Sequence, residues 1–99
     1  MKIPPFKLKG KLWLYTGKGA WHFVTVEKDD AQAISDEYIW PRKGFGSIPV
    51  TVSIGSSEWN TSIFPEKKGT FLLPIKKSVR DKEDLQEGDT ISYSLTIRS

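Results

Sequence analysis

The chain has 99 residues, of which 37% are hydrophobic and 12% aromatic, a net charge of +3 at pH 7 and no cysteine. We therefore expect residues 1–99 to form one small domain with a single hydrophobic core, and the missing thiols exclude disulfides, thiolate metal sites and cysteine nucleophiles. No apolar run reaches the ~20 residues of a membrane helix, and none follows Lys2 as a secretory signal requires, so we expect a cytoplasmic protein without a membrane partner.

The first half of the chain predicts two strands and a helix. Apolar residues alternate with lysines in residues 6–14, which is typical of a half-buried strand with a lysine-lined outer face. After a glycine turn, residues 21–26 are aromatic and β-branched and predict a second strand. A helix capped by Asp29 or Asp30 follows, and Pro41 ends it because the residue before a proline leaves helical geometry.

The second half predicts four strands and a short basic helix. Residues 48–54 alternate strictly, and a turn at a Gly-Ser-Ser sequence joins them to residues 58–64 in a hairpin. Residues 71–75 are apolar without alternation, as expected for a strand buried on both faces. Ser78 is the expected cap of the short helix. The alternating residues 91–97 form the last strand.

The two halves share one pattern. The strand at 21–26, its helix, a glycine turn and the strand from Ile48 match the strand at 71–75, its helix, a second glycine turn and the strand from Ile91. This pattern predicts a barrel with internal pseudo-twofold symmetry. Chance similarity between two strand-helix-strand segments is the alternative.

A motif in the last third supports a family resemblance: Leu73-Pro74, then Arg80, then Leu85-x-x-Gly88-Asp89 before the alternating strand. It resembles the core of AbrB-type and MazE-type double-split β-barrels. The wider order of motifs is similar to an uncharacterised bacterial and archaeal family of domains of unknown function with the same barrel fold. That order is a Trp-x-Phe-Val strand, Arg42 before a glycine, residues 50–54, then Trp59-x-Thr61-Ser62-x-Phe64-Pro65. The resemblance spans about residues 6–95 and implies a mainly-β double-split barrel with two short helices.

The resemblance also implies an alternative function, because AbrB-type proteins bind DNA as dimers. Here one chain contains both halves of the barrel. Asp29 and Asp30 stand in the first half where the second half has Lys77 and Ser78. Symmetric DNA recognition is therefore not expected, and we predict only weak, salt-sensitive binding to nucleic acid.

Catalytic patterns are missing from the sequence. His22 is the only histidine and lies within a predicted strand, where a structural role is expected. No serine occupies a Gly-x-Ser-x-Gly motif. Asp81, Glu83 and Asp84 do not have the spacing of a calcium loop. We therefore expect a non-catalytic protein with no catalytic residue, no metal and no cofactor.

Four polar residues are the candidate ligand site. Arg42, Ser62, Lys76 and Arg80 are expected to meet near one barrel mouth, and arginine binds a carboxylate or phosphate through two parallel hydrogen bonds. The alternative, which we favour, is that Arg80 holds its helix by bonding backbone carbonyls or Asp89, while Lys76 lies in solvent. The predicted function is a small binding or accessory module for an anionic ligand or a protein partner.

The four tryptophans leave a second possibility open. Aromatic side chains near lysines can stack on bases, which favours nucleic acid. However, Trp13, Trp21, Trp40 and Trp59 all fall inside predicted elements, and tryptophan is a common core residue. Trp40, beside Pro41, is the best candidate for an exposed ring.

Overall fold

A computed structural model describes residues 5–17, 19–38 and 46–98 of the chain. These residues form a mainly-β fold with two short helices, as predicted. The elements in chain order are β1 (Phe6–Leu14), β2 (His22–Val26), α1 (Lys28–Glu37), β3 (Ile48–Ile54), β4 (Ser57–Pro65), β5 (Phe71–Pro74), α2 (Lys77–Lys82) and β6 (Thr90–Ile97). Among these residues no helix has the length and apolar character needed to cross a membrane.

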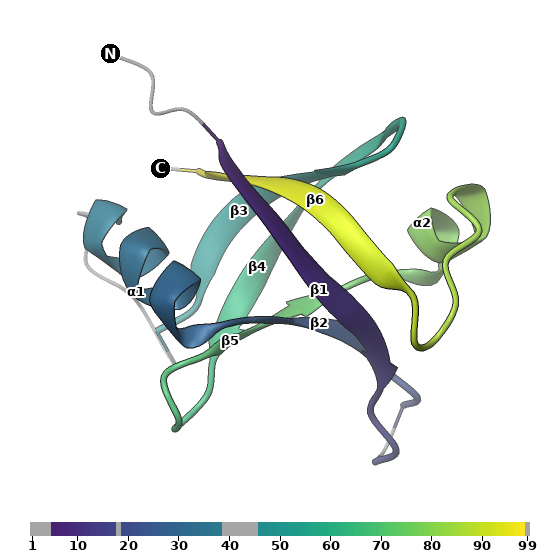
Figure 1. Cartoon of the computed structure of the whole chain (residues 1–99), viewed down its shortest axis with the longest axis horizontal. Helices are drawn as coiled ribbons and strands as arrows, with labels where there is room; N and C mark the ends of the chain where they lie inside the picture. The colour runs from purple at the N-terminus through teal and green to yellow at the C-terminus, as the bar shows by residue number, and fades with distance from the viewer. Residues whose placement is uncertain (1–4, 18, 39–45, 99) are drawn as a thin grey trace.

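The six strands close into an antiparallel barrel in the order β1-β2-β5-β4-β3-β6 (Figure 1). Two strands change partner along their length. Residues 6–11 of β1 pair with β6, whereas residues 12–14 pair with β2. Residues 57–63 of β4 pair with β3, and only residues 64 and 65 pair with β5. The wall between β4 and β5 is therefore hydrogen-bonded over a short stretch only.

The core lies inside the barrel and follows the alternation of the strands. Ile48, Val50 and Val52 of β3 have no exposed surface, and they face the buried side chains of the other strands. The absence of a side chain at Gly10 lets β1 approach β2 closely, because a Cβ there would lie 2.7 Å from Val24 Cγ1. Close packing of this kind tolerates little added volume.

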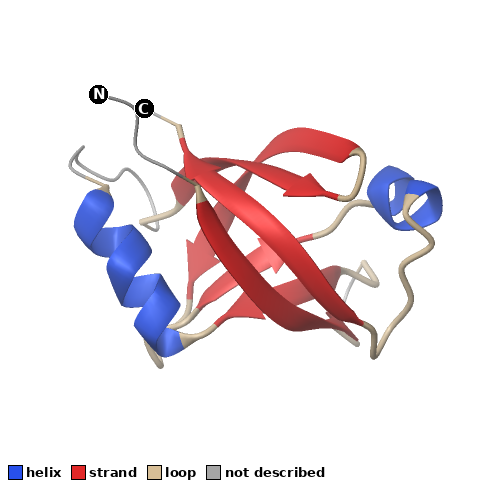
Figure 2. Cartoon of the chain, turned by 45° about the horizontal axis from the view of Figure 1, so that its top comes forward, coloured by secondary structure: helices blue, strands red, loops and turns tan. Residues whose placement is uncertain are grey.

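The helices lie outside the strands on opposite sides of the barrel (Figure 2). α1 buries Ala31 and Ile34 against the core, and α2 buries Val79. Each helix therefore presents a narrow apolar stripe to the barrel and a polar face to solvent.

The start of α1 differs from the sequence prediction. Glu27 is the N-cap residue, and its side chain makes no capping hydrogen bond. Asp29 and Asp30 lie in the first turn instead, where their negative charges interact favourably with the helix dipole. The predicted cap was wrong because packing of the buried face, rather than a capping side chain, sets where this helix begins. Pro41 lies outside the described residues.

The predicted cap of α2 was also wrong. Ser78 lies inside the helix, and Lys76 occupies the N-cap position. The Ile75 amide still donates to the carbonyl of His22, so the hydrogen bonding between β5 and β2 continues as far as Ile75. The Lys76 carbonyl then accepts hydrogen bonds from the amides of Val79 and Arg80 at 3.1 Å each. The helix therefore begins directly where the strand pairing stops.

Candidate ligand-binding site

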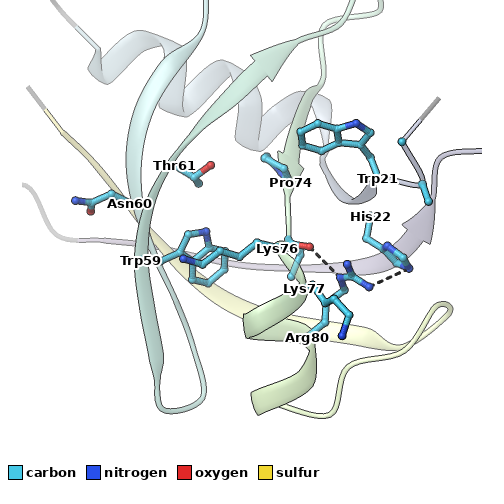
Figure 3. Close-up of a pocket in the computed structure, with 12 residues that line it drawn as sticks. Trp21, His22, Trp59, Asn60, Thr61, Pro74, Lys76, Lys77 and Arg80 are labelled. Atoms are coloured by element: carbon cyan, nitrogen blue, oxygen red, sulfur yellow. Dashed lines mark hydrogen bonds between the residues drawn. The ribbon is translucent and has the colours of Figure 1, made fainter. Parts of the chain in front are cut away.

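A hollow of about 360 Å³ lies beside the short junction between β4 and β5. Its wall combines the β1–β2 turn, the start of β2, the middle of β4, and the segment that leads from β5 into α2 (Figure 3). We call it the β4–β5 hollow and define it by Trp21, His22, Trp59, Lys76, Lys77 and Arg80. Among the described residues that line it, none is an aspartate or a glutamate.

The half-buried guanidinium of Arg80 is held in place by two contacts. Its Nε donates to the carbonyl of Ile75 at 3.1 Å, and one terminal nitrogen lies 3.5 Å from His22 Nε2 (Figure 3). The predicted bond to a backbone carbonyl is thus present. The alternative partner, Asp89, makes no hydrogen bond or ion pair with Arg80; its carboxylate accepts the amide of Gln86 at 2.8 Å.

The second terminal nitrogen of Arg80 has no partner among the described residues. A guanidinium carries five N–H donors in a fixed planar arrangement. The two contacts orient the guanidinium plane, and the N–H groups of the second terminal nitrogen stay available as donors. Arg80 can therefore both hold α2 to the barrel and donate to a bound anion.

His22 supports Arg80 from the first position of β2. Arginine is only a donor, so His22 Nε2 must accept this contact, and the ring proton then lies on Nδ1. Nδ1 is buried and has no hydrogen-bond partner. His22 is half-buried, and the structural role expected for it stays a prediction.

The two lysines at the start of α2 differ in their pairing. Lys77 Nζ forms an exposed ion pair with Asp81 at 2.7 Å, which offsets its charge. Lys76 is exposed and has no ion-pair or hydrogen-bond partner among the described side chains. In Figure 3 its side chain extends across the hollow toward the indole of Trp59. Lys76 and Arg80 therefore give the hollow an uncompensated positive charge.

The structure brings together only two of the four predicted site residues. Lys76 and Arg80 line the hollow, but Ser62 does not. Ser62 pairs with Pro49 and lies on the outer face of β4, because successive side chains of a strand point to opposite faces. Arg42 lies outside the described residues.

The tryptophans are candidate stacking residues from the sequence, but none of them was assigned to the ligand site. Trp59 is only 8% exposed, as predicted for a core residue, and one edge of it lines the hollow. Trp21 was expected in the core, yet 53% of its surface is exposed. The prediction for Trp21 was wrong because this residue precedes β2, at the end of an exposed turn. Trp40 lies outside the described residues.

A second depression of about 510 Å³ lies on the outer face of β1, β2, β5 and β4. We call it the aromatic groove. Its lining consists of six apolar or aromatic residues, Trp13, Tyr15, Trp21, Phe23, Phe64 and Leu72, together with Glu66, whose carboxylate accepts the Thr70 hydroxyl. The register of the strands explains this cluster, because Trp13 is opposite Phe23 and Phe64 is opposite Leu72. The sequence held a signal for it, since Trp13 and Tyr15 continue the outward-facing positions of the lysine-rich strand.

The fold and site together define a small antiparallel β-barrel with a cationic surface hollow beside an exposed aromatic groove. Residues 9–95 match the family described as a domain of unknown function (DUF1905). The chain belongs to this family, which confirms the predicted resemblance to an uncharacterised family of domains of unknown function. No curated protein matches the chain.

Proposed function

We propose that this protein is a non-catalytic binding module that holds an anionic ligand in the β4–β5 hollow. The observation that supports the proposal most strongly is the meeting of Arg80 and Lys76 in a depression whose described lining contains no carboxylate. Arg80 is already oriented by Ile75 and His22, so little side-chain freedom is lost when an anion binds. The favoured ligand groups are phosphate and carboxylate, which accept paired hydrogen bonds from a guanidinium.

The arrangement favours binding over catalysis. The accepting nitrogen of His22 faces Arg80, so it is not directed at a nucleophile within the hollow. A nucleophile needs a base within hydrogen-bond reach, and no hydroxyl–base hydrogen bond occurs among the described residues that line the hollow. We therefore keep the proposal that the protein has no enzymatic activity and no cofactor. A cytoplasmic location and a single domain over residues 1–99 remain predictions.

The fold proposal is a double-split barrel with internal pseudo-twofold symmetry. Two features of the pairing support it. β1 and β4 each divide their length between two neighbours. The strand order is also symmetric between the two halves of the chain. If β1 is exchanged with β4, β2 with β5 and β3 with β6, every strand keeps a neighbour of the corresponding kind, and the order around the barrel is the same. This symmetry favours an AbrB-like ancestry, with duplex DNA binding as the second candidate function. Asp29 and Asp30 at the first turn of α1 oppose symmetric DNA contacts.

Thermal unfolding in the presence of inorganic phosphate, sulfate or a dicarboxylate tests the anion site. A ligand at 100 times its Kd stabilises the folded state by about 2.7 kcal/mol, which raises the Tm of a domain of this size by about 10 °C or more. Lys76→Ala is the cleanest variant, since the Lys76 side chain has no hydrogen-bond or ion-pair partner within the described part of the chain.

Lys28→Ala is the matched control, because Lys28 is an exposed lysine at the start of the other helix. We expect the anion-dependent rise in Tm in the wild type and in Lys28→Ala, and a much smaller rise in Lys76→Ala. An equal rise in all three proteins, or none in the wild type, would contradict the proposed site.

A further inference from the structure

The aromatic groove is the least expected feature of the surface. Tyr15, Trp21 and Phe64 are 46%, 53% and 42% exposed, respectively, and they lie around one depression. Scattered apolar residues are normal on a protein surface, whereas a contiguous aromatic patch indicates a binding surface. The groove is not needed to close the barrel, because the core residues lie on the opposite face of the same strands.

The rings of the groove are arranged as a rigid platform. Phe23 lies at its centre, 6.0 Å from Trp21 with an interplanar angle of 6°, and 5.4 Å from Trp13. Tyr15 contacts Phe23 edge-on at 6.3 Å. The indole N–H of Trp13 donates to the Thr25 hydroxyl at 2.9 Å, which fixes that ring. Flat apolar groups can therefore stack here at a small entropic cost.

The groove and the β4–β5 hollow adjoin at Trp21, which lines both of them. The aromatic platform therefore borders the hollow that Lys76 and Arg80 line. A ligand that spans the two needs flat rings in the groove and an anionic group in the hollow. Nucleic acid combines these two features in each nucleotide.

The outer face of β1 adds further positive charge next to the groove. Lys7, Lys9 and Lys11 are exposed and occupy the same face of the strand as Trp13. Side chains on one face of a strand repeat at about 6.8 Å, so these lysines form a row that leads to the aromatic residues. A cationic row beside a stacking platform is the arrangement with which proteins bind single-stranded nucleic acid.

We infer that the aromatic groove and the β4–β5 hollow together bind single-stranded nucleic acid. Bases stack on the platform at Trp21 and Phe23, and a backbone phosphate contacts Arg80 and Lys76. A duplex is a poorer ligand, because its bases are stacked on one another and cannot reach the platform. The inference rests on the proposed function, since it requires an anion in the hollow.

Fluorescence anisotropy with a labelled oligothymidylate of about 10 nucleotides tests this inference, with a hairpin duplex of the same sequence length as competitor. We expect the single strand to bind more tightly than the duplex. Trp21→Ala should weaken binding at least fivefold, and Trp21→Phe should restore most of it, because a phenyl ring still stacks. Circular dichroism of both variants verifies that they fold.

The salt dependence of oligonucleotide binding distinguishes the contribution of the hollow from that of the groove. Each cation that contacts a phosphate of a single strand contributes about 0.7 to the slope of log K against log salt concentration. Lys76→Ala is therefore expected to reduce that slope by about 0.7, whereas Trp21→Ala leaves it nearly unchanged. Lys28→Ala serves as the matched control and should preserve both the affinity and the slope.

Several results would overturn the inference. Equal affinity for duplex and single strand, or binding that Trp21→Ala leaves unchanged, would exclude stacking in the groove. A phosphate-dependent rise in Tm that needs Lys76, without oligonucleotide binding, would overturn this inference and leave the proposed anion site intact. Oligonucleotide binding that needs Trp21 but not Lys76 would overturn the anion site as well. Self-association that Trp21→Ala abolishes, without oligonucleotide binding, would assign the groove to a protein contact instead.

Discussion

Replacing Arg80 by alanine should destabilise the fold even in the absence of a ligand. The change removes the donor of the 3.1 Å hydrogen bond to the Ile75 carbonyl and the contact with His22 Nε2. A half-buried carbonyl that loses its donor costs about 1–3 kcal/mol. We expect a loss of about 2 kcal/mol in the free energy of unfolding, which lowers the Tm by about 10 °C in a domain of this size.

Lys77→Ala in the same helix is the matched control for this prediction. Its ion pair with Asp81 is well exposed, with 77% and 64% of the two side chains accessible to solvent. Such a pair contributes about 0.5 kcal/mol or less. Urea denaturation followed by tryptophan fluorescence measures both variants. If Arg80→Ala loses no more stability than Lys77→Ala, the guanidinium does not hold α2 to the barrel.

Three further predictions concern stability. Gly55→Ala should destabilise the fold in urea titrations, because φ is +57° there and a Cβ would displace the Glu83 carboxylate from the hydroxyls of Ser56 and Ser57. Unchanged stability would contradict this prediction. The hydrogen bond from Ser57 lowers the pKa of Glu83 below its ordinary 4.5, so its contribution to stability is present above that pH and is lost as the pH falls. Glu83→Gln should therefore flatten the acid limb of the stability curve, and an unchanged limb would contradict this. Burial raises the pKa of Tyr93, so stability is retained below about pH 10 and declines above it by up to about 1.4 kcal/mol per pH unit. Tyr93→Phe should show a shallower alkaline decline than the wild type, and an equal decline would contradict the role of Tyr93.

The strands could be predicted because their patterns are local. Alternation in residues 6–14 and 48–54 gave strand bounds that agree with β1 and β3. The starts of α1 and α2 were missed, since both capping residues lack a side-chain capping bond and the helices begin where buried contacts and strand pairing require. Local sequence contains no signal for such tertiary constraints.

The candidate site could be predicted only in part, because its residues come from distant segments. Lys76 and Arg80 lie in one short stretch, and their basic character is visible in the sequence. The contact of Arg80 with His22 spans 58 positions and depends on the pairing of β2 with β5. Ser62 was placed at the site although its position in β4 directs it to the outer face. The strand order, which no local pattern contains, decides which of these residues meet.

Nuclear magnetic resonance titration with inorganic phosphate tests the central claim, that an anion binds in the β4–β5 hollow, most directly. We predict that the Nε–H signal of Arg80 and the indole N–H signal of Trp21 shift together and saturate with a single Kd, while the backbone amide of Lys28 stays in place. Small, unsaturated shifts spread over all exposed lysines, with Arg80 unaffected, would show that the hollow does not bind anions.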